Sequence, residues 1–438
     1  MTTLLAFAFV FGLVVLFHEA GHFFTAKIIG VRVKVFSFGF PPKLIGRKWG
    51  DTEYQLCLLP IGGYVKMAGD NPIDATGDPR EFMSRTKWER LAIYFAGPLM
   101  NLVLTIGILT ILFMVGMEKP AGLDDPAFVR FVAEDSPAAR SGVRPGDQIV
   151  AIDGSSIDTW SDAIDAFIVH ANDTLTLTLL RDGERIEKDV LVETRTEDQI
   201  PYTGLLPPVQ PKVTSLSDDF PAKAAGMQEG DIITRVDDKP IFHFEELIDA
   251  IESKGGERVS LSVLRDNETI DFELTPKRAN DRWLIGIQFD SAPTVTHQIR
   301  NPVLALGAAV NESGRLIRLL YVVLGRLVTG QASVRQMSGP IGIAEASGET
   351  ARRGARALFL FVAFLSINLG ILNLLPIPLL DGGHMAIIAL EGLAGRDFSL
   401  QVKERILQVG LVMLLLLMAT VIYVDLSRID AIGKYLPW

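Results

Sequence analysis

The chain has 438 residues, of which 48% are hydrophobic, and its formal net charge is −10. Four segments are too long and too apolar for ordinary core helices, which excludes a fully soluble protein. Cys57 is the single cysteine, so neither an intrachain disulfide nor a cysteine-based structural zinc site can form. Any metal ion must therefore be held by His, Asp or Glu.

The apolar segments predict four membrane-spanning helices. The first has about 23 residues before Lys27, enough to cross ~30 Å of hydrocarbon. Since no basic residue precedes Lys27 and nothing resembles a cleavage site, a span is favoured over a signal peptide. The predicted spans are residues 1–30, 91–117, 357–390 and 405–426.

The distribution of charge predicts the orientation of these spans. Residues 27–90 hold eleven Lys and Arg, and the short 391–405 loop holds three, so both face the cytoplasm. Residues 117–300 and both termini then lie outside. This exterior segment has 19 Lys and Arg against 35 Asp and Glu, a net charge of −16, which argues against nucleic acid binding.

Residues 31–90 are predicted to be a β-rich loop on the cytoplasmic side. Val31, Val33 and Val35 alternate with basic residues, and residues 52–59 form a second strand-like run. An exposed strand here could bind an unwound peptide by edge addition, or the sheet could only scaffold the spans.

The exterior segment contains an internal repeat at an offset of 84 residues, predicting two domains at 121–206 and 207–292. The offset aligns the G-x-x-x-G-D pattern ending at Asp147 with the one ending at Asp231, and Trp160 with Phe244. The pattern of strands and helices resembles tandem, circularly permuted PDZ domains, which implies an α+β fold and peptide recognition at a sheet edge. The alternative is a pair of spacer modules that bind nothing.

Residues 301–350 are predicted to form amphipathic helices on the outer membrane surface, since Arg315, Arg318 and Arg326 interrupt their apolar runs. A fifth span here would place Asp381 and His18 on opposite sides of the bilayer.

The first span carries the motif His18-Glu19-Ala20-Gly21-His22. H-E-x-x-H on a helix places two imidazoles on one face, where both reach one Zn²⁺ and the Glu faces the reacting water. A carboxylate inside a membrane costs at least ~2.5 kcal/mol and is by default functional. The alternative is that these side chains only hydrogen-bond within a helix bundle.

A catalytic zinc needs a third protein ligand, which should be a membrane acid or His384. Asp381 is the strongest candidate, because Pro376 and Pro378 break the third span just before it and Gly382 allows a sharp turn after it. Broken backbone at membrane depth is tolerated where it lines a cavity.

The chain resembles the site-2 protease family in three features taken together. These are an intramembrane H-E-x-x-H, the motif N-x-x-P-x-P-x-L-D-G over residues 373–382, and two exterior PDZ-like repeats. The resemblance implies a helical bundle of four spans in the bacterial inner membrane, with a re-entrant β-rich loop and periplasmic PDZ domains. It also implies zinc-dependent cleavage of transmembrane segments. The substrates of such enzymes are an anti-sigma factor after a first cut, in an envelope stress response, and remnant signal peptides.

The resemblance assigns roles to individual residues. His18, His22 and Asp381 are expected to hold one Zn²⁺, and Glu19 is expected to act as the general base, on the cytoplasmic side of the membrane. The expected substrate-binding residues are Asn368, Asn373 and Asn101, with hydrogen bonding between helices as the alternative for each.

Two other classes of protein remain as alternatives. A membrane-anchored scaffold would bind no metal and would tolerate changes at Glu19. A transporter would show inverted repeats of broken helices, and only one Pro-interrupted span is present.

Overall fold

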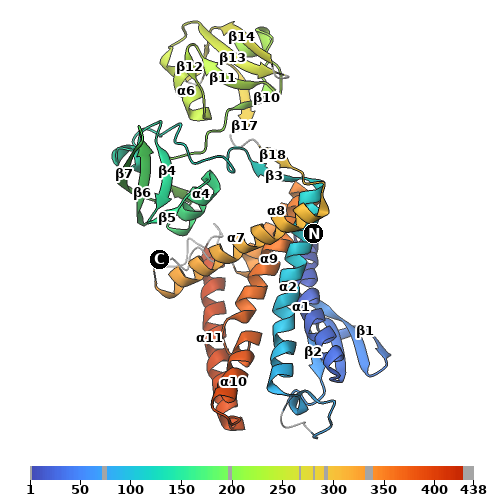
Figure 1. The fold of residues 1–438 in the computed structure, drawn as a ribbon. Coiled ribbons are helices and arrows are strands. Elements are labelled where there is room, and N and C mark those ends of the chain that lie inside the picture. The colour runs from blue at the N-terminus through green and yellow to red at the C-terminus, as the bar shows by residue number, and fades with distance from the viewer. Residues whose placement is uncertain are drawn as a thin grey trace. The chain divides into compact units, whose positions relative to one another are not determined.

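The computed structural model describes residues 2–71, 76–195, 200–265, 268–279, 282–290, 294–330 and 339–427. The chain divides into two compact units, one formed by residues 1–117 with 298–438 and the other by residues 118–297 (Figure 1). Each unit is described by itself.

Four helices of the first unit are long and apolar enough to cross a membrane, and within the described ranges they are the helices that meet both conditions. They are α1 (Thr2–Ile29), α2 (Lys87–Val115), α9 (Ala355–Leu374) and α11 (Leu400–Ser427). Helix α2 packs against both α1 and α9 around a core that includes Val14, Leu109 and Val362. Helix α11 is far more exposed, as expected for a helix that faces lipid.

Helix α2 begins at Lys87, four residues before the predicted start of the second span. Thr86 and Glu89 form a capping box, in which the Thr86 hydroxyl accepts from the Glu89 amide and the Glu89 carboxylate accepts from the Thr86 amide. This cap fixes the start of the helix three residues before Arg90 and two turns before Tyr94.

Within its described residues, the first unit has three further α-helices. They are α7 (Pro302–Val328), α8 (Pro340–Arg353) and α10 (Asp381–Leu393). Helix α7 lies in the segment predicted to be amphipathic, and it is not among the candidate spans. The third apolar stretch is broken, because α9 ends at Leu374 and α10 starts at Asp381.

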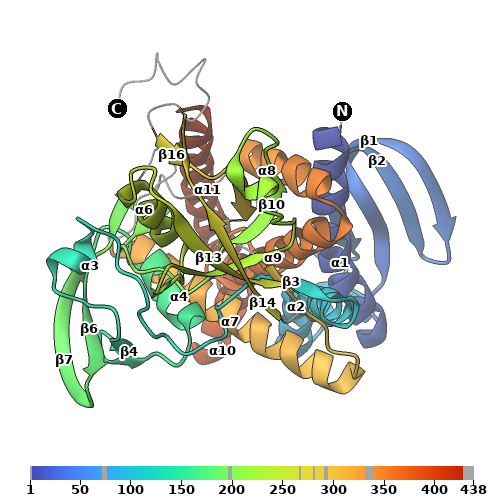
Figure 2. The ribbon, with the colours of Figure 1, turned by 90° about the horizontal axis from the view of Figure 1, so that it is seen from above.

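The loop between α1 and α2 forms a sheet that lies beside α1 in both views (Figures 1 and 2). It consists of β1 (Val33–Trp49) and β2 (Thr52–Met67), followed by the 3-10 turn η2 (Phe82–Ser84). Residues 33–38 of β1 pair on one side with residues 53–56 and on the other with residues 63–67. The segment 63–67 is therefore an edge of this sheet.

The second unit contains two similar sheets with their helices. The first copy comprises β4 (Gln148–Ile152), β5 (Ser155–Ser156), β6 (Thr174–Arg181), β7 (Glu184–Leu191), β8 (Glu193–Arg195), β9 (Ile200–Tyr202), α3 (Pro137–Arg140) and α4 (Trp160–Val169). The second comprises β10 (Lys212–Leu216), β11 (Ile232–Val236), β12 (Lys239–Pro240), β13 (Val259–Arg265), β14 (Glu268–Leu274), β15 (Lys277–Ala279), β16 (Arg282–Leu284), β17 (Ile287–Asp290), α5 (Pro221–Ala224) and α6 (Phe244–Ser253). Two short strands, β3 (Met117–Pro120) and β18 (Thr294–His297), pair with each other.

The repeat extends to individual contacts. In the first copy, Arg181 binds Asp147 through two hydrogen bonds of 2.6 and 2.8 Å and donates to the Gly142 carbonyl. In the second, Arg265 binds Asp231 at 2.7 and 2.8 Å and donates to the carbonyl of the equivalent glycine. These contacts explain why the G-x-x-x-G-D pattern recurs: in each copy the paired arginine binds both its aspartate and its first glycine.

Burial alone would raise the pKa of Asp147 and Asp231. The hydrogen bonds from the paired arginine and from a backbone amide outweigh it and lower both pKa values. Each aspartate is therefore a charged anchor inside its domain.

Candidate active site

Three side chains that could hold a metal ion converge from α1 and from the start of α10. His18 Nε2 lies 3.1 Å and His22 Nε2 lies 3.5 Å from Oδ2 of Asp381, and the two ring nitrogens are 3.2 Å apart. Both histidines are buried and project from the same face of α1, because they are four residues apart.

These distances fit a zinc ion. In a tetrahedral site with zinc–ligand distances of 2.0–2.1 Å, neighbouring donor atoms are about 3.3–3.4 Å apart. Oδ2 of Asp381 is buried and accepts no hydrogen bond from the described residues, so a cation would satisfy it. The three residues thus provide two imidazoles and one carboxylate, a ligand set found in catalytic zinc sites, and leave room for a fourth ligand.

Contacts with α2 fix the orientation of both histidine rings. Nδ1 of His22 lies 2.8 Å from the carbonyl of Ile93, so this nitrogen carries the proton and Nε2 is free to bind a metal. Nδ1 of His18 lies 3.3 Å from Nδ2 of Asn101, and Oδ1 of Asn101 has no partner among the described residues. If His18 binds a metal through Nε2, its Nδ1 carries the proton and needs an acceptor. The side-chain amide of Asn101 must then be flipped so that its Oδ1 faces His18 Nδ1.

Two glycines allow α1 and α2 to approach closely enough for these contacts. A Cβ atom on Gly21 would lie 2.2 Å from the Ala96 carbonyl oxygen. A Cβ atom on Gly97 would lie 2.3 Å from His22 Nε2 and 2.8 Å from Cε1 of His18. Any larger residue at Gly97 would therefore collide with both histidines.

The break between α9 and α10 places Asp381 next to His18 and His22. Added Cβ atoms on Gly382 and Gly383 would lie 2.3 and 2.2 Å from carbonyl oxygens of the preceding turn, so both positions require glycine. Asp381 is the first residue of α10, where the positive end of the helix dipole favours a carboxylate.

A cavity of about 300 Å³ opens onto the three ligands and Glu19. The edge of the β-sheet forms part of its wall through Tyr64, Val65 and Met67. The backbone of Gly63 in that edge comes so close to Glu19 that an added Cβ would lie 3.2 Å from its Cγ. The acid between the two histidines therefore lies between the ligands and an unpaired strand edge.

The three asparagines expected to bind substrate have different positions. Asn373 lines the cavity, and its amide nitrogen lies 3.3 Å from His18 Nε2. Asn101 is fully buried behind His18, and Asn368 does not line the cavity. His384, the other possible third ligand, instead stacks on Tyr94 with ring centroids 5.0 Å apart.

Several residues of the site were not found from the sequence. Tyr94 lines the cavity, and Ile93 contributes only its carbonyl. None of these has a distinctive spacing in the sequence. Gly97 likewise makes room for the two histidines.

Comparison with known proteins agrees with this geometry. The sequence pattern described as peptidase family M50 matches residues 6–417. A protein named putative zinc metalloprotease from Xylella fastidiosa strain 9a5c is 33% identical, over 95% of this chain and 96% of the relative. The regulator of sigma-E protease RseP of Escherichia coli K12 is 31% identical, over 97% of this chain and 98% of the relative. A solved PDZ domain of an SdrC-like protein from Listeria monocytogenes is 28% identical and covers 18% of this chain and 86% of that domain, with a TM-score of 0.17.

The family pattern spans both motifs, from before His18 to beyond Asp381, and two relatives above 30% identity cover nearly the whole chain. The resemblance to the site-2 proteases is thereby confirmed. The chain belongs to peptidase family M50, the site-2 protease family, and is a metalloprotease.

Proposed function

We propose that the chain is a zinc-dependent endopeptidase that cleaves transmembrane segments of other proteins, with one Zn²⁺ held by His18, His22 and Asp381. The observation that carries the proposal is the convergence of these three donor atoms within a bundle of helices long and apolar enough to cross a membrane. A protease for soluble substrates would have no need to bury its ligands there.

The residues around the ligands have separate tasks in peptide hydrolysis. A bound zinc supplies a Lewis acid that makes water more acidic and polarises the scissile carbonyl. Glu19 takes a proton from the attacking water and gives it to the leaving amine. The Ile93 carbonyl orients His22, and Asn101 orients His18 rather than touching substrate.

A transmembrane helix must open before it can be cleaved, because its carbonyls are held in i→i−4 hydrogen bonds. Each backbone group exposed in lipid costs several kcal/mol unless another partner replaces the lost one. The edge at residues 63–67 offers unpaired strand groups beside Glu19, and Asn373 offers an amide in the same cavity. We expect the opened substrate to bind there as an added strand.

The four apolar helices and the bacterial relatives support a bacterial inner-membrane protein. The distribution of Lys and Arg supports an active site on the cytoplasmic side and a periplasmic location for residues 118–297. One relative is named for regulating sigma-E. By analogy, the substrates would include an anti-sigma factor already shortened by another protease, and remnant signal peptides.

The two repeats of the second unit would act as PDZ domains that screen substrates. The three candidate ligands and Glu19 all lie in the other unit. Deletion of residues 125–290 should therefore leave catalysis intact and permit cleavage of proteins with bulky periplasmic domains that the full chain refuses. If the folded deletion variant still refuses all of them, the repeats do not select by size.

Cleavage of a model transmembrane substrate by the purified protein tests the function. We expect a chelator to abolish cleavage and added zinc to restore it. Asp381→Asn should lower both zinc content and cleavage, because the amide carries no charge to balance the ion. Full activity in metal-free protein would contradict the proposal.

A further inference from the structure

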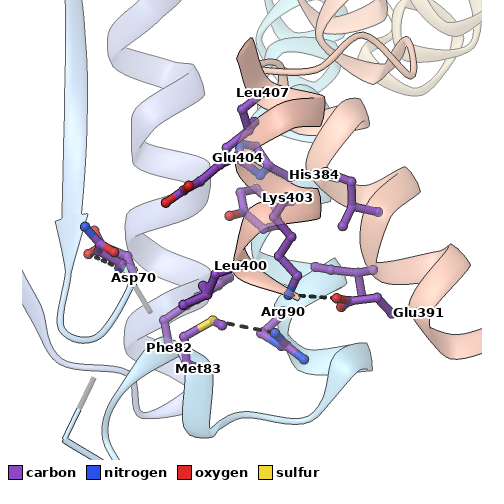
Figure 3. A pocket seen from close by; sticks show the side chains of 14 residues that line it. Asp70, Phe82, Met83, Arg90, His384, Glu391, Leu400, Lys403, Glu404 and Leu407 are labelled. Carbon is purple, nitrogen blue, oxygen red and sulfur yellow. Dashed lines mark hydrogen bonds and ion pairs between the residues drawn. The ribbon is translucent and has the colours of Figure 1, made fainter. Parts of the chain in front are cut away.

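A second pocket lies next to the catalytic cavity and shares one wall with it. It has a volume of about 390 Å³ and is bounded by the start of α2, by α10 and by the start of α11 (Figure 3). Tyr94 lines both spaces, and its ring stacks on His384, which lines the second pocket. The two spaces therefore adjoin at Tyr94.

The pocket contains a buried cation that forms no ion pair with a described carboxylate. Arg90 is 7% exposed, and its Nε has no hydrogen-bond partner in the described ranges. Its guanidinium donates only to the sulfur of Met83, at 3.6 Å, and it forms no ion pair with any described carboxylate. An unpaired buried charge costs several kcal/mol, so the site is suited to an anionic ligand.

The pocket also contains a buried acceptor without a donor. Oε1 of Glu391 binds the Lys403 ammonium at 2.7 Å and the Phe398 amide at 2.8 Å. Oε2 of the same carboxylate is buried and has no partner among the described residues. Figure 3 shows Arg90 at the same end of the pocket as the Glu391–Lys403 pair.

An unpaired donor and an unpaired acceptor together match the last residue of a peptide chain. Its carboxylate can accept from a guanidinium, and its amide N–H can donate to a carboxylate oxygen. Hydrolysis creates such a terminus, because the hydroxyl of water joins the scissile carbonyl carbon and the proton goes to the leaving nitrogen. The fragment on the N-terminal side of the cut therefore ends in a new carboxylate.

We propose that this pocket is a product site, in which Arg90 pairs with the new carboxylate of the N-terminal fragment. This fragment leaves toward the cytoplasm when the N-terminus of the substrate is cytoplasmic. The proposal rests on the proposed function for the identity of that fragment. The apolar side chains of Phe82, Leu400 and Leu407 would cover the residues before the terminus.

The acidic side chains that line the pocket suit a fragment with a basic flank. Asp70 and Glu404 also line the pocket, and they would attract the Lys and Arg residues that flank a transmembrane segment on its cytoplasmic side. An anionic lipid headgroup would be repelled by these two carboxylates. The wall shared with the catalytic cavity further favours a product over a lipid.

Binding of two labelled peptides to the purified full-length protein tests the proposal. Both have a lysine-rich start and an apolar end, and one ends in a free carboxylate while the other ends in a carboxamide. The protein is first treated with a chelator, so that a metal ion cannot bind the carboxylate. We expect the carboxylate peptide to bind about tenfold more tightly, since charge-assisted hydrogen bonds differ by this much from neutral ones.

Arg90→Gln should remove this preference, whereas Arg80→Gln, which changes an exposed arginine outside the pocket, should retain it. Arg90→Lys retains the charge and should keep part of the preference, which covers the case that Arg90→Gln does not fold. Equal binding of the two peptides to the wild-type protein would overturn the proposal, as would a preference that persists in Arg90→Gln.

Labelled phosphatidylethanolamine separates a lipid site from a product site. Loss of lipid binding in Arg90→Gln with unchanged peptide binding would assign the pocket to a headgroup and overturn the proposal. Substrate cleavage is measured separately on the metal-loaded protein. A protein that cleaves but shows no carboxylate preference disproves only the product site, and one that shows the preference but cleaves nothing disproves only the proteolytic role.

Discussion

Gly97 is the position at which the smallest change should do the most damage to the metal site. In Gly97→Ala the new Cβ would lie 2.3 Å from Nε2 of His22 and 2.8 Å from Cε1 of His18. Ordinary contacts between nonbonded carbon atoms are about 3.5–4.0 Å, so the rings or the helix must move by about 1 Å. Metal–ligand distances tolerate changes of only about 0.2 Å.

We therefore expect Gly97→Ala to lower zinc affinity by at least about 10–100-fold, the effect typical of a disturbed ligand orientation, and to lower cleavage in parallel. Helix propensity alone would stabilise α2 by about 1 kcal/mol on this change, so loss of the helix is not the expected cause.

Gly107→Ala is the matched control for this prediction. It lies on the same helix, and nothing lies within 4 Å of the added Cβ. It should keep full zinc content and activity. Zinc is measured by elemental analysis of purified protein and by competition with a chelator. Wild-type zinc affinity and turnover in Gly97→Ala would refute the reasoning about close helix packing.

Three further outcomes are expected. Asn101→Ala should weaken zinc binding by about 10–100-fold in the same competition assay, and unchanged affinity would remove its orienting role. Arg181→Ala should lower the free energy of unfolding of the 118–297 unit by about 2–3 kcal/mol, because Asp147 stays buried and unpaired, whereas Arg258→Ala, in an exposed ion pair, should cost well under 1 kcal/mol. The pKa values of Asp147 and Asp231 are lowered in the folded state, so both carboxylates stabilise the fold at pH values above their unfolded pKa of about 4. This stabilisation should be lost as the pH falls below that value. Urea unfolding midpoints that stay the same between pH 6 and pH 3 would contradict this expectation.

The convergence of His18, His22 and Asp381 was predictable because short motifs in the sequence indicate their chemistry. H-E-x-x-H sets His18 and His22 on one helix face, and the two prolines and two glycines around Asp381 mark a break that brings an acid into the membrane. The internal repeat was likewise visible as a fixed offset, although the arginine that makes its buried ion pair was not identified.

The rest of the site depends on packing between segments far apart in sequence. The Ile93 carbonyl orients His22 only because α2 packs against α1 at the level of His22. Gly97 is critical to the placement of both histidines for the same reason. The strand edge at residues 63–67 exists because β2 folds back over both sides of β1, a register that alternation of residue types does not reveal. In the sequence Arg90 is an ordinary basic residue at a helix start, and only the structure reveals that no described carboxylate pairs with it.

Zinc content and substrate cleavage measured together on Glu19→Gln test the central claim most directly. The amide nearly matches the carboxylate in shape but cannot accept a proton from water. The protein should therefore bind zinc as tightly as wild type and leave a model transmembrane substrate uncleaved. Cleavage at the wild-type rate by zinc-loaded Glu19→Gln would contradict the account.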